Sequence, residues 1–329
     1  MKTNKIYIGN CTEVLKTFPD NCVDMVVTSP PYWQLRNYEM DGQLGLEKTP
    51  EEYVENLVKV FRKIKRVLKP NGTVWLNLGD CYYGGGWKGD KSDKSKSKQA
   101  TNKGSMCGKT MQHDQPHPII KTKDLVGIPW MTAFALRKDG WFLRQDIVWF
   151  KTNSMPESVT DRCTKSHEYV FLLSKSPKYY FDYKAIQEIA TGYDGRKDTK
   201  MKGSLKYKKA VMPNSTEHTM ALRGHQRWQT NEKGSMLRNK RSVWSIPNKA
   251  NNEKHYASFP VKLIKPMILA GSKENDIVLD PFMGIGTTAI VAKRLGRRFV
   301  GIELNPQYAK RAIIRAERAV YKPKLLNLK

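Results

Sequence analysis

A strand–helix–strand pattern near the N-terminus limits the possible folds more than any other feature of the chain. Val23–Thr28 is an almost continuous apolar and β-branched run, as expected of a strand buried on both faces. Thr49-Pro50-Glu51-Glu52 then supplies an N-cap, a first-turn proline and a capping-box carboxylate. Apolar residues repeat at helical spacing until Pro70-Asn71-Gly72, and Thr73–Leu78 is the next predicted strand. Strands joined by a crossover helix predict a parallel sheet with right-handed connections.

The rest of the chain repeats this alternation around two basic interruptions. Residues 84–123 and 191–241 are rich in lysine and poor in apolar side chains, which is typical of loops and appended modules. We therefore expect a core in three pieces, 1–83, 124–190 and 246–329, interrupted by a basic insertion at 84–123 and a basic module at 191–245. The other predicted elements are strands over Lys5–Gly9, Ile147–Lys151, Tyr169–Ser174, Asp276–Asp280 and Arg298–Glu303, and helices over Leu125–Arg137, Phe259–Ala270, Thr287–Leu295 and Gln307–Val320.

The charge of the chain indicates a polyanionic partner. Its 58 Lys and Arg against 31 Asp and Glu give a net charge of +27, which favours nucleic acid first and an anionic membrane surface second. No stretch approaches the roughly 18 apolar residues of a spanning helix, and the first residues lack the apolar core of a signal peptide. We therefore expect a cytoplasmic protein that does not associate with membranes.

Cysteine and histidine spacing gives no sign of a metal site. The five cysteines show no C-x-x-C pattern, so we expect reduced thiols rather than a disulfide framework or a zinc ribbon. His113 and His117 stand four residues apart, but Pro116 and Pro118 argue against a helix that would place both on one face. These histidines are interpreted as solvated loop residues, and no metal is expected.

The segment Thr28-Ser29-Pro30-Pro31-Tyr32-Trp33 directly follows an apolar strand. Two prolines end the strand and fix an extended turn, so the simplest interpretation is a rigid loop. Ligands in open α/β sheets bind beyond the carboxyl ends of strands, however. There the Ser29 oxygen and the Pro30 carbonyl could accept the two hydrogens of an exocyclic amine. Tyr32 offers a ring on which a planar base could stack, and Trp33 is a second candidate for stacking or core packing.

A glycine-containing loop, Asp280-Pro281-Phe282-Met283-Gly284-Ile285-Gly286-Thr287-Thr288, follows a predicted strand and opens a predicted helix. Glycines at such a turn allow a nucleotide cofactor to approach the backbone closely. Gly284-x-Gly286-x-x-Ala289 formally matches the dinucleotide fingerprint, and Glu303 at the end of the next strand could hold a ribose in either case. Asp280 stands between the strand and the glycines, which argues against a nicotinamide site.

Taken together, these segments resemble the amino-methylating DNA methyltransferases of bacteria, archaea and phages. DPFMGIGTT is similar to the cofactor loop of that family and TSPPYW to its catalytic loop, in the order of the permuted beta subgroup. The basic segments match no family motif, as expected of a target-recognition region at 191–245. The resemblance implies a Rossmann-like, doubly wound α/β methyltransferase sheet, circularly permuted so that the two ends of the chain meet, with basic insertions for DNA recognition.

The resemblance also implies S-adenosyl-L-methionine as the cofactor and assigns residues to it. His255, Ser258 and Phe259 would lie near its methionine end, and Asn10 stands where many relatives have Asp, so we expect an altered contact with the adenine rather than a lost one. The implied catalytic residues are Ser29, Pro30, Pro31 and Tyr32, and the remaining cofactor-binding residues are Asp280, Pro281, Phe282, Gly284, Gly286, Thr287 and Glu303.

Ser29 bears on which base is methylated. Adenine-N6 enzymes of the family usually carry Asp here, whereas Ser before Pro-Pro-Tyr is more usual in cytosine-N4 enzymes. Adenine-N6 methylation on the same scaffold stays an alternative, as does a DNA-binding protein without catalysis. RNA or protein glutamine methylation fits less well. Carbon-5 methylation would need a nucleophilic cysteine after proline, and the chain has no Pro-Cys.

The implied partner is double-stranded DNA with the target base flipped out, joined by a cognate restriction endonuclease if the enzyme belongs to a restriction–modification pair. A monomer and a homodimer are both compatible with the sequence. Arg pairs bidentately with guanine, which makes arginines in the basic module candidate base readers. Arg162, with His167 and Glu168, would lie near the flipped base or form a surface ion-pair cluster. The predicted DNA-binding residues are Arg162, Arg223, Arg227, Arg238 and Arg241.

Overall fold

The computed structural model describes residues 1–84, 117–190, 229–230, 236–248 and 259–321. The chain divides into two compact units. One comprises Met1–Asp182 with Arg241–Leu326, and the other comprises Tyr183–Lys240 with Asn327–Lys329. In the described part of the second unit, the strands β6 (Glu188–Ile189), β8 (Met236–Arg238) and β7 (Gln229–Thr230) form an antiparallel sheet in that order. It is preceded by the short 3₁₀ turn η1 (Lys184–Ile186).

The first unit is built on an eight-stranded sheet of order β1-β11-β10-β2-β3-β5-β4-β9. The five strands from β1 to β3 are parallel, β5 runs antiparallel to both β3 and β4, and β9 is parallel to β4. The strands are β1 (Lys5–Ile8), β2 (Val23–Thr28), β3 (Leu68–Leu78), β4 (Phe142–Phe150), β5 (His167–Ser174), β9 (Val243–Ser245), β10 (Ile277–Asp280) and β11 (Arg298–Glu303).

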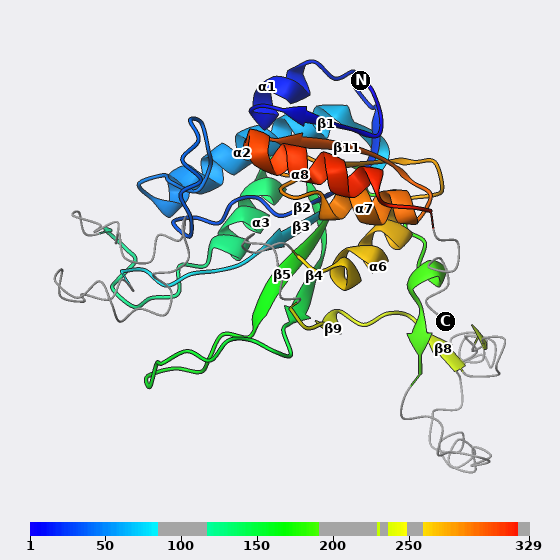
Figure 1. Cartoon of the computed structure of the whole chain (residues 1–329). Helices are drawn as coiled ribbons and strands as arrows, with labels where there is room; N and C mark the ends of the chain where they lie inside the picture. The colour runs from blue at the N-terminus through cyan, green and yellow to red at the C-terminus, as the bar shows by residue number, and fades with distance from the viewer. Residues whose placement is uncertain (85–116, 191–228, 231–235, 249–258, 322–329) are drawn as a thin grey trace, which may run out of the picture. The chain divides into compact units, whose positions relative to one another are not determined.

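The two ends of the chain meet in this sheet, as the permuted arrangement predicts. β1 pairs with β11 in parallel, with Tyr7 opposite Ile302, and Figure 1 shows the blue first strand beside the orange-red last one. β9 adds one more strand at the opposite edge. Its residues lie within the basic module of the sequence-based division, but Trp244 is buried and the strand pairs with β4, so it belongs to the main sheet.

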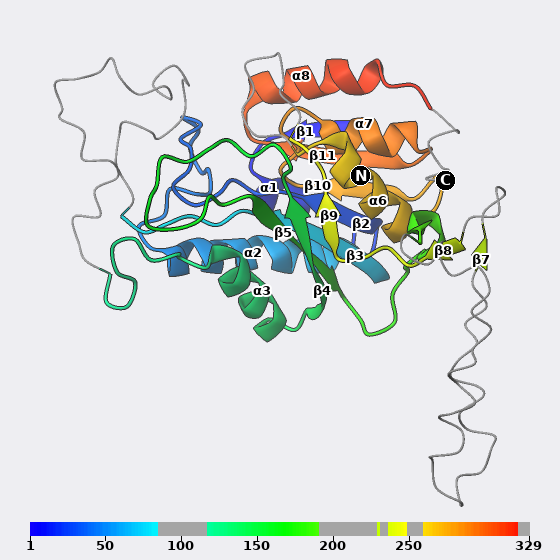
Figure 2. The same cartoon turned by 90° about the horizontal axis from the view of Figure 1, so that it is seen from below.

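Helices cover both faces of the sheet, which confirms the doubly wound α/β fold. The helices α1, α2 and α3 pack against one another on one face and α6, α7 and α8 on the other (Figure 2). Within the described residues, no helix is both long enough and apolar enough to cross a lipid bilayer. The helices are α1 (Cys11–Lys16), α2 (Pro50–Val67), α3 (Ile128–Lys138), α6 (Val261–Gly271), α7 (Thr287–Arg294) and α8 (Pro306–Glu317).

Helix α2 begins where the sequence predicts. The Thr49 hydroxyl accepts a hydrogen bond from the Glu52 amide at 3.2 Å, and Pro50 occupies the first turn. Leu57, Phe61 and Ile64 are fully buried on one side of the helix. The burial of each such side chain contributes about 1.5–3 kcal/mol to the stability of the fold. This packing fixes α2 beside the loop that follows β2.

Candidate functional site

A cavity of about 260 Å³ opens at the carboxyl ends of β1, β2, β10 and β11. Residues from the two sequence motifs line it together, although about 250 positions separate them in the chain. The cavity is therefore the place where the proline-rich loop and the glycine-containing loop meet, as expected for a ligand site in an open α/β sheet. Predicted site residues on its wall are Asn10, Ser29, Pro30, Pro31, Tyr32, Phe259, Pro281, Phe282, Gly284, Thr287 and Glu303.

The proline-rich loop is held rigidly against the core. The Pro31 carbonyl accepts a hydrogen bond from the fully buried Tyr53 hydroxyl of α2 at 2.7 Å. The Trp33 side chain is buried, and its Nε1 donates to the Glu47 carbonyl at 2.9 Å. Of the two interpretations of Trp33, core packing is therefore the one that the structure shows.

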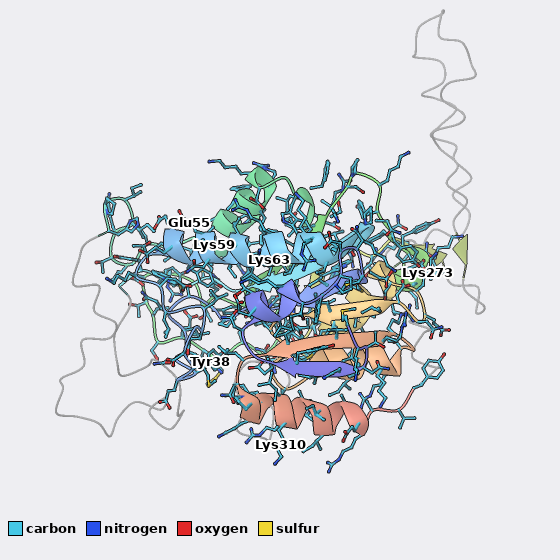
Figure 3. The ribbon with its side chains drawn as sticks, turned by 90° about the horizontal axis from the view of Figure 1, so that it is seen from above. Tyr38, Glu55, Lys59, Lys63, Lys273 and Lys310 are labelled. Carbon is cyan, nitrogen blue, oxygen red and sulfur yellow. The ribbon has the colours of Figure 1, made fainter. Side chains whose placement is uncertain are left out.

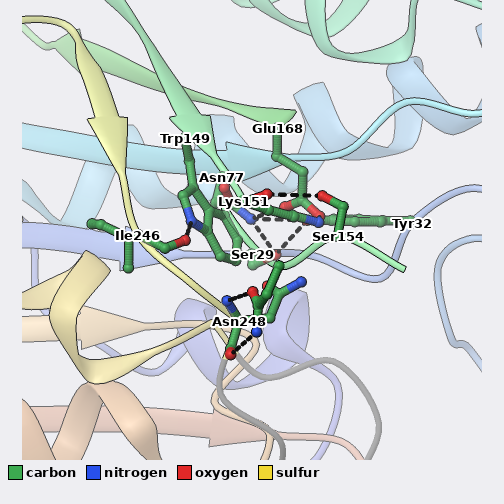
Figure 4. Close-up of polar contacts among 10 residues, drawn as sticks. Ser29, Tyr32, Asn77, Trp149, Lys151, Ser154, Glu168, Ile246 and Asn248 are labelled. Atoms are coloured by element: carbon green, nitrogen blue, oxygen red, sulfur yellow. Dashed lines mark hydrogen bonds and ion pairs between the residues drawn. The ribbon is translucent and has the colours of Figure 1, made fainter. Parts of the chain in front are cut away.

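Ser29 and Tyr32 belong to a polar network at the cavity wall (Figure 4). The Tyr32 hydroxyl donates to Glu168 Oε2 at 2.6 Å, and Asn77 Nδ2 donates to the Tyr32 oxygen and to Glu168 Oε2, both at 2.8 Å. Ser29 Oγ lies 3.4 Å from both Tyr32 Oη and Asn77 Nδ2. Lys151 Nζ forms an ion pair with Glu168 Oε1. The site therefore places a carboxylate one hydroxyl group away from Ser29.

The environment of Tyr32 keeps its hydroxyl protonated. Burial raises the pKa of Tyr32 well above its usual value, and the neighbouring Glu168 carboxylate raises it further. The ring edge lies close to the backbone of Gly79, where an added Cβ would come within 2.6 Å of Tyr32 Cε2. Glycine at this position leaves room for the ring just beyond the end of β3. Stacking of a base on Tyr32 stays a prediction.

The sequence suggests that Asp280 lines the cofactor, but in the structure this residue does not line the cavity. Its side chain is buried and accepts hydrogen bonds from Thr28 Oγ1 at 2.7 Å, Thr288 Oγ1 at 2.6 Å and the Phe282 amide at 3.1 Å. These contacts tie the end of β2 to the end of β10 and to the start of α7. Asp280 shapes the glycine-containing loop rather than presenting a group to the cofactor.

The buried carboxyl of Asp280 should make stability depend on pH. Burial raises the pKa of Asp280 to about 6, so the folded protein holds this proton more tightly than the unfolded chain does. Its contribution to stability is present below pH about 4 and is lost as the pH rises through about 6. From pH 4 to 7 we expect the free energy of unfolding of the wild type to fall by about 2 kcal/mol relative to Asp280→Asn. Urea unfolding of both proteins across this range measures the difference, and curves that stay parallel would contradict it.

Glu303 lines the cavity and is suited to hold a diol. Its Oε2 accepts from the Gly284 amide at 2.7 Å and its Oε1 from the Asn305 amide at 2.8 Å. A carboxylate oxygen can accept more than one hydrogen bond, so each retains capacity for a hydroxyl group. Burial raises the pKa of Glu303 above its usual value, and the two backbone donors offset part of this rise. The arrangement fits a ribose held at the end of β11.

Asn10 is the N-cap of α1. Its Oδ1 accepts from the Thr12 amide at 2.9 Å and the Thr12 hydroxyl at 2.6 Å, while its Nδ2 donates to the Gly42 carbonyl at 3.3 Å. This capping role explains how an amide serves in place of Asp, since both side chains offer an acceptor to the helix N-terminus. Asn10 also lines the cavity.

Several cavity residues were not singled out from the sequence. Tyr38, between β2 and α2, and Tyr308 of α8 lie edge to face, with ring centroids 6.3 Å apart. Lys59 of α2, whose Nζ donates to Asn56 Oδ1 at 3.1 Å, also reaches the cavity wall. Tyr38 and Lys59 are labelled in Figure 3. Aromatic side chains beside Phe282 and Glu303 fit an adenine ring and a ribose, so the cavity suits the nucleoside of S-adenosyl-L-methionine.

The remaining predicted residues are distributed as follows. His255, Ser258, Arg223 and Arg227 lie outside the described residues. Arg238 pairs with Glu188 across β6 and β8 at 3.0 Å, and the Arg241 carbonyl accepts from Trp244 Nε1 at 2.7 Å.

The predicted ion-pair cluster of Arg162, His167 and Glu168 does not form as a unit. Arg162 pairs with Glu157 and stacks on the Tyr82 ring at 3.8 Å, whereas Glu168 pairs with Lys151. His167 packs edge to face against Tyr169. No group of three or more potential metal ligands occurs among the described residues.

Solved structures share this fold over almost the whole chain. TTHA0409 of Thermus thermophilus, in its complex with S-adenosyl-L-methionine, is 25% identical, covers 96% of this chain and 94% of its own, and superposes with a TM-score of 0.55. The cytosine-N4-specific PvuII DNA methyltransferase has a TM-score of 0.62 at 18% identity, covering 99% of this chain and 90% of its own. The fold is that of an S-adenosyl-L-methionine-dependent methyltransferase.

The family is defined by the sequence. The DNA methylase model for N6 and N4 enzymes matches residues 23–315. The type II methyltransferase M.SmaI of Serratia marcescens is 41% identical over 312 residues, which cover 94% of this chain and 89% of that protein. M.Cfr9I of Citrobacter freundii is 40% identical, with 95% and 87% covered. The chain belongs to the N6/N4 DNA methylase family, with S-adenosyl-L-methionine as cofactor and DNA as substrate.

Proposed function

We propose that the protein is a sequence-specific DNA methyltransferase that methylates N4 of cytosine in a base flipped out of the duplex. The observation that carries this proposal is Ser29, a neutral hydroxyl at the cavity wall, which would face the exocyclic nitrogen of the target base. The relatives at about 40% identity carry the name type II methyltransferase. That name supports a place in a restriction–modification system. A cognate endonuclease, a cytoplasmic location and a monomeric or homodimeric state stay predictions from the sequence.

The geometry supports direct attack of the amine on the cofactor. S-adenosyl-L-methionine supplies an electrophilic methyl group on its sulfonium when bound. Glu303 would hold its ribose, and Phe282 with Tyr38 would enclose its adenine. Ser29 accepts one N–H of the target amine and orients its nitrogen. A neutral hydroxyl accepts more weakly than a carboxylate, so Ser29 would orient the amine without deprotonating it first. The proton would pass from the methylated nitrogen to solvent water after methyl transfer.

The target nitrogen lies inside a base pair, so the base must leave the stack at a cost of a few kcal/mol. Stacking on an aromatic ring returns roughly 1–3 kcal/mol, and Tyr32 on the cavity wall would provide that ring. The net charge of +27 supplies affinity for phosphates that carries no sequence information. Exposed lysines such as Lys59 on α2 and Lys310 on α8 contribute to this charge (Figure 3).

Nucleoside mass spectrometry on DNA from cells that express the protein tests the proposal, and single-molecule sequencing locates the modified site. We expect N4-methylcytosine at one short recognition sequence. N6-methyladenine would instead establish the adenine alternative and show that Ser29 does not set base choice. Absence of any modified base, together with absent cofactor binding in calorimetry, would favour a DNA-binding protein without catalysis.

A further inference from the structure

The hydroxyl groups around Ser29 form a chain of hydrogen bonds whose direction is set from one end. A carboxylate only accepts hydrogen bonds, so the Tyr32 hydroxyl donates its proton to Glu168 Oε2 at 2.6 Å. The Tyr32 oxygen then offers only lone pairs toward its other neighbours. It accepts from Asn77 Nδ2 at 2.8 Å and from Ser29 Oγ at 3.4 Å. The single proton of Ser29 therefore points to Tyr32.

Asn77 and Lys151 maintain this direction. Asn77 Nδ2 lies 2.8 Å from Glu168 Oε2, and an amide turned the other way would place its oxygen against the carboxylate. Lys151 Nζ pairs with Glu168 Oε1, and the two side chains are only 20% and 12% exposed. The Lys151 ammonium and the Asn77 amide thus donate to the Glu168 carboxylate, as the Tyr32 hydroxyl does. Glu168 acts in the network purely as an acceptor.

The same count of protons and lone pairs leaves an acceptor position open at the Ser29 hydroxyl. A hydroxyl has one proton and two lone pairs. The proton points to Tyr32, and Asn77 Nδ2, which lies 3.4 Å away, already donates its two hydrogens to Tyr32 and Glu168 at 2.8 Å. Ser29 lines the cavity, so an acceptor position of its oxygen remains available to a ligand there. Ser29 thus presents an acceptor to the ligand, although a serine hydroxyl on its own could equally donate.

We propose that Glu168, held by Lys151, is a positioning residue that makes Ser29 an obligate acceptor, so that the site selects a target base with an amino group over one with a carbonyl at the same position. The inference rests on the proposed function, because it takes Ser29 as the group that faces the exocyclic nitrogen. A cytosine N–H donates to the open lone pair. Uracil, the deamination product of cytosine, carries the acceptor O4 in place of the amino group. The lone pairs of O4 would face the open lone pair of Ser29.

The test compares the affinity of two DNA duplexes that differ only at the target base. Each carries the recognition sequence with cytosine or uracil opposite an abasic site, which removes the difference in base pairing, and S-adenosylhomocysteine is present to prevent turnover. We expect the wild type to bind the cytosine duplex about 10-fold more tightly, as an unmatched acceptor pair costs more than a lost hydrogen bond. In Glu168→Gln the new amide can donate to Tyr32, the chain can reverse, and the preference should fall to about 2-fold.

Two further variants separate positioning from folding. Glu157→Gln removes a carboxylate of the same segment that pairs with Arg162 outside the network, and it should keep the wild-type preference. Tyr32→Phe removes the acceptor of the Ser29 proton without changing any charge, and it should lose the preference as Glu168→Gln does. Thermal unfolding and cofactor affinity identify a variant that has merely lost its fold.

The result that would overturn the inference is a Glu168→Gln protein that loses affinity for both duplexes equally, with the ratio unchanged. A wild type that binds both duplexes with the same affinity would overturn it as well. If mass spectrometry shows that adenine is the substrate, the proposed function fails separately. The ratio for adenine and hypoxanthine, which differ in the same way at position 6, then decides the inference.

Discussion

Ser29→Ala should reduce the turnover number roughly 10²-fold or more, while the affinity for S-adenosyl-L-methionine stays within a few-fold of the wild type. The reason is the position of the hydroxyl, which belongs to the network with Tyr32 and Asn77 and lies on the cavity wall formed by the proline-rich loop. The groups that suit the ribose belong to Glu303 at the end of β11. Single-turnover methyl transfer and isothermal calorimetry measure the two quantities separately.

A matched control is Ser176→Ala. The Ser176 hydroxyl donates to the Pro70 and Lys178 carbonyls, and the residue does not line the cavity. Its loss should leave both turnover and cofactor affinity near wild-type values. If Ser29→Ala loses cofactor affinity and turnover by the same factor, the hydroxyl serves the cofactor rather than the base. Unchanged turnover would show that another acceptor faces the amine.

Local patterns are enough to predict much of this fold. The cap at Thr49, the strand Val23–Thr28 and the closing strand Arg298–Glu303 depend on residues that are near in sequence, and the structure confirms all three. The meeting of the chain ends could also be predicted, because the order of two recognisable loops fixes which strands adjoin. The same strand order places the proline-rich loop and the glycine-containing loop at neighbouring strand ends, and both loops line one cavity.

The polar network beside Ser29 could not be derived in this way. Asn77 lies inside an apolar strand, and Lys151 and Glu168 stand on neighbouring antiparallel strands or just beyond them, so only the strand register brings them together. In the sequence, Glu168 is equally compatible with a surface ion pair to Arg162. A polar residue inside an otherwise apolar strand, such as Asn77, is the one signal that could have indicated a buried partner.

The glycine-containing loop illustrates a second limit. A glycine can be required by a ligand, by the backbone angle or by a neighbouring helix, and the sequence does not distinguish these reasons. Gly284 has a φ of +54° with no atom within 4 Å of an added Cβ, and it lines the cavity. Gly286 has a φ of +84°, but an added Cβ would lie 2.9 Å from the Cβ of Ala312. The expectation that Gly286 lines the cofactor is therefore corrected, since its missing side chain makes room for α8.

Gly286→Val should consequently unfold the protein more easily rather than block the cofactor. A left-handed backbone angle costs a non-glycine residue roughly 1–2 kcal/mol, and overpacking against Ala312 costs about 1–3 kcal/mol more. For a chain of 329 residues, the sum lowers the melting temperature by roughly 3–7 °C. Thermal unfolding is measured without cofactor, because a bound ligand raises the melting temperature by itself.

Gly284→Ala is the matched comparison, because it has the same class of backbone angle without a neighbour to displace. It should cost only about 1 kcal/mol from the backbone. The order of the two melting temperatures, with Gly286→Val well below Gly284→Ala, distinguishes helix packing from ligand approach. A Gly286→Val protein that melts within about 2 °C of the wild type but no longer binds S-adenosyl-L-methionine would restore the original assignment of this glycine to the cofactor.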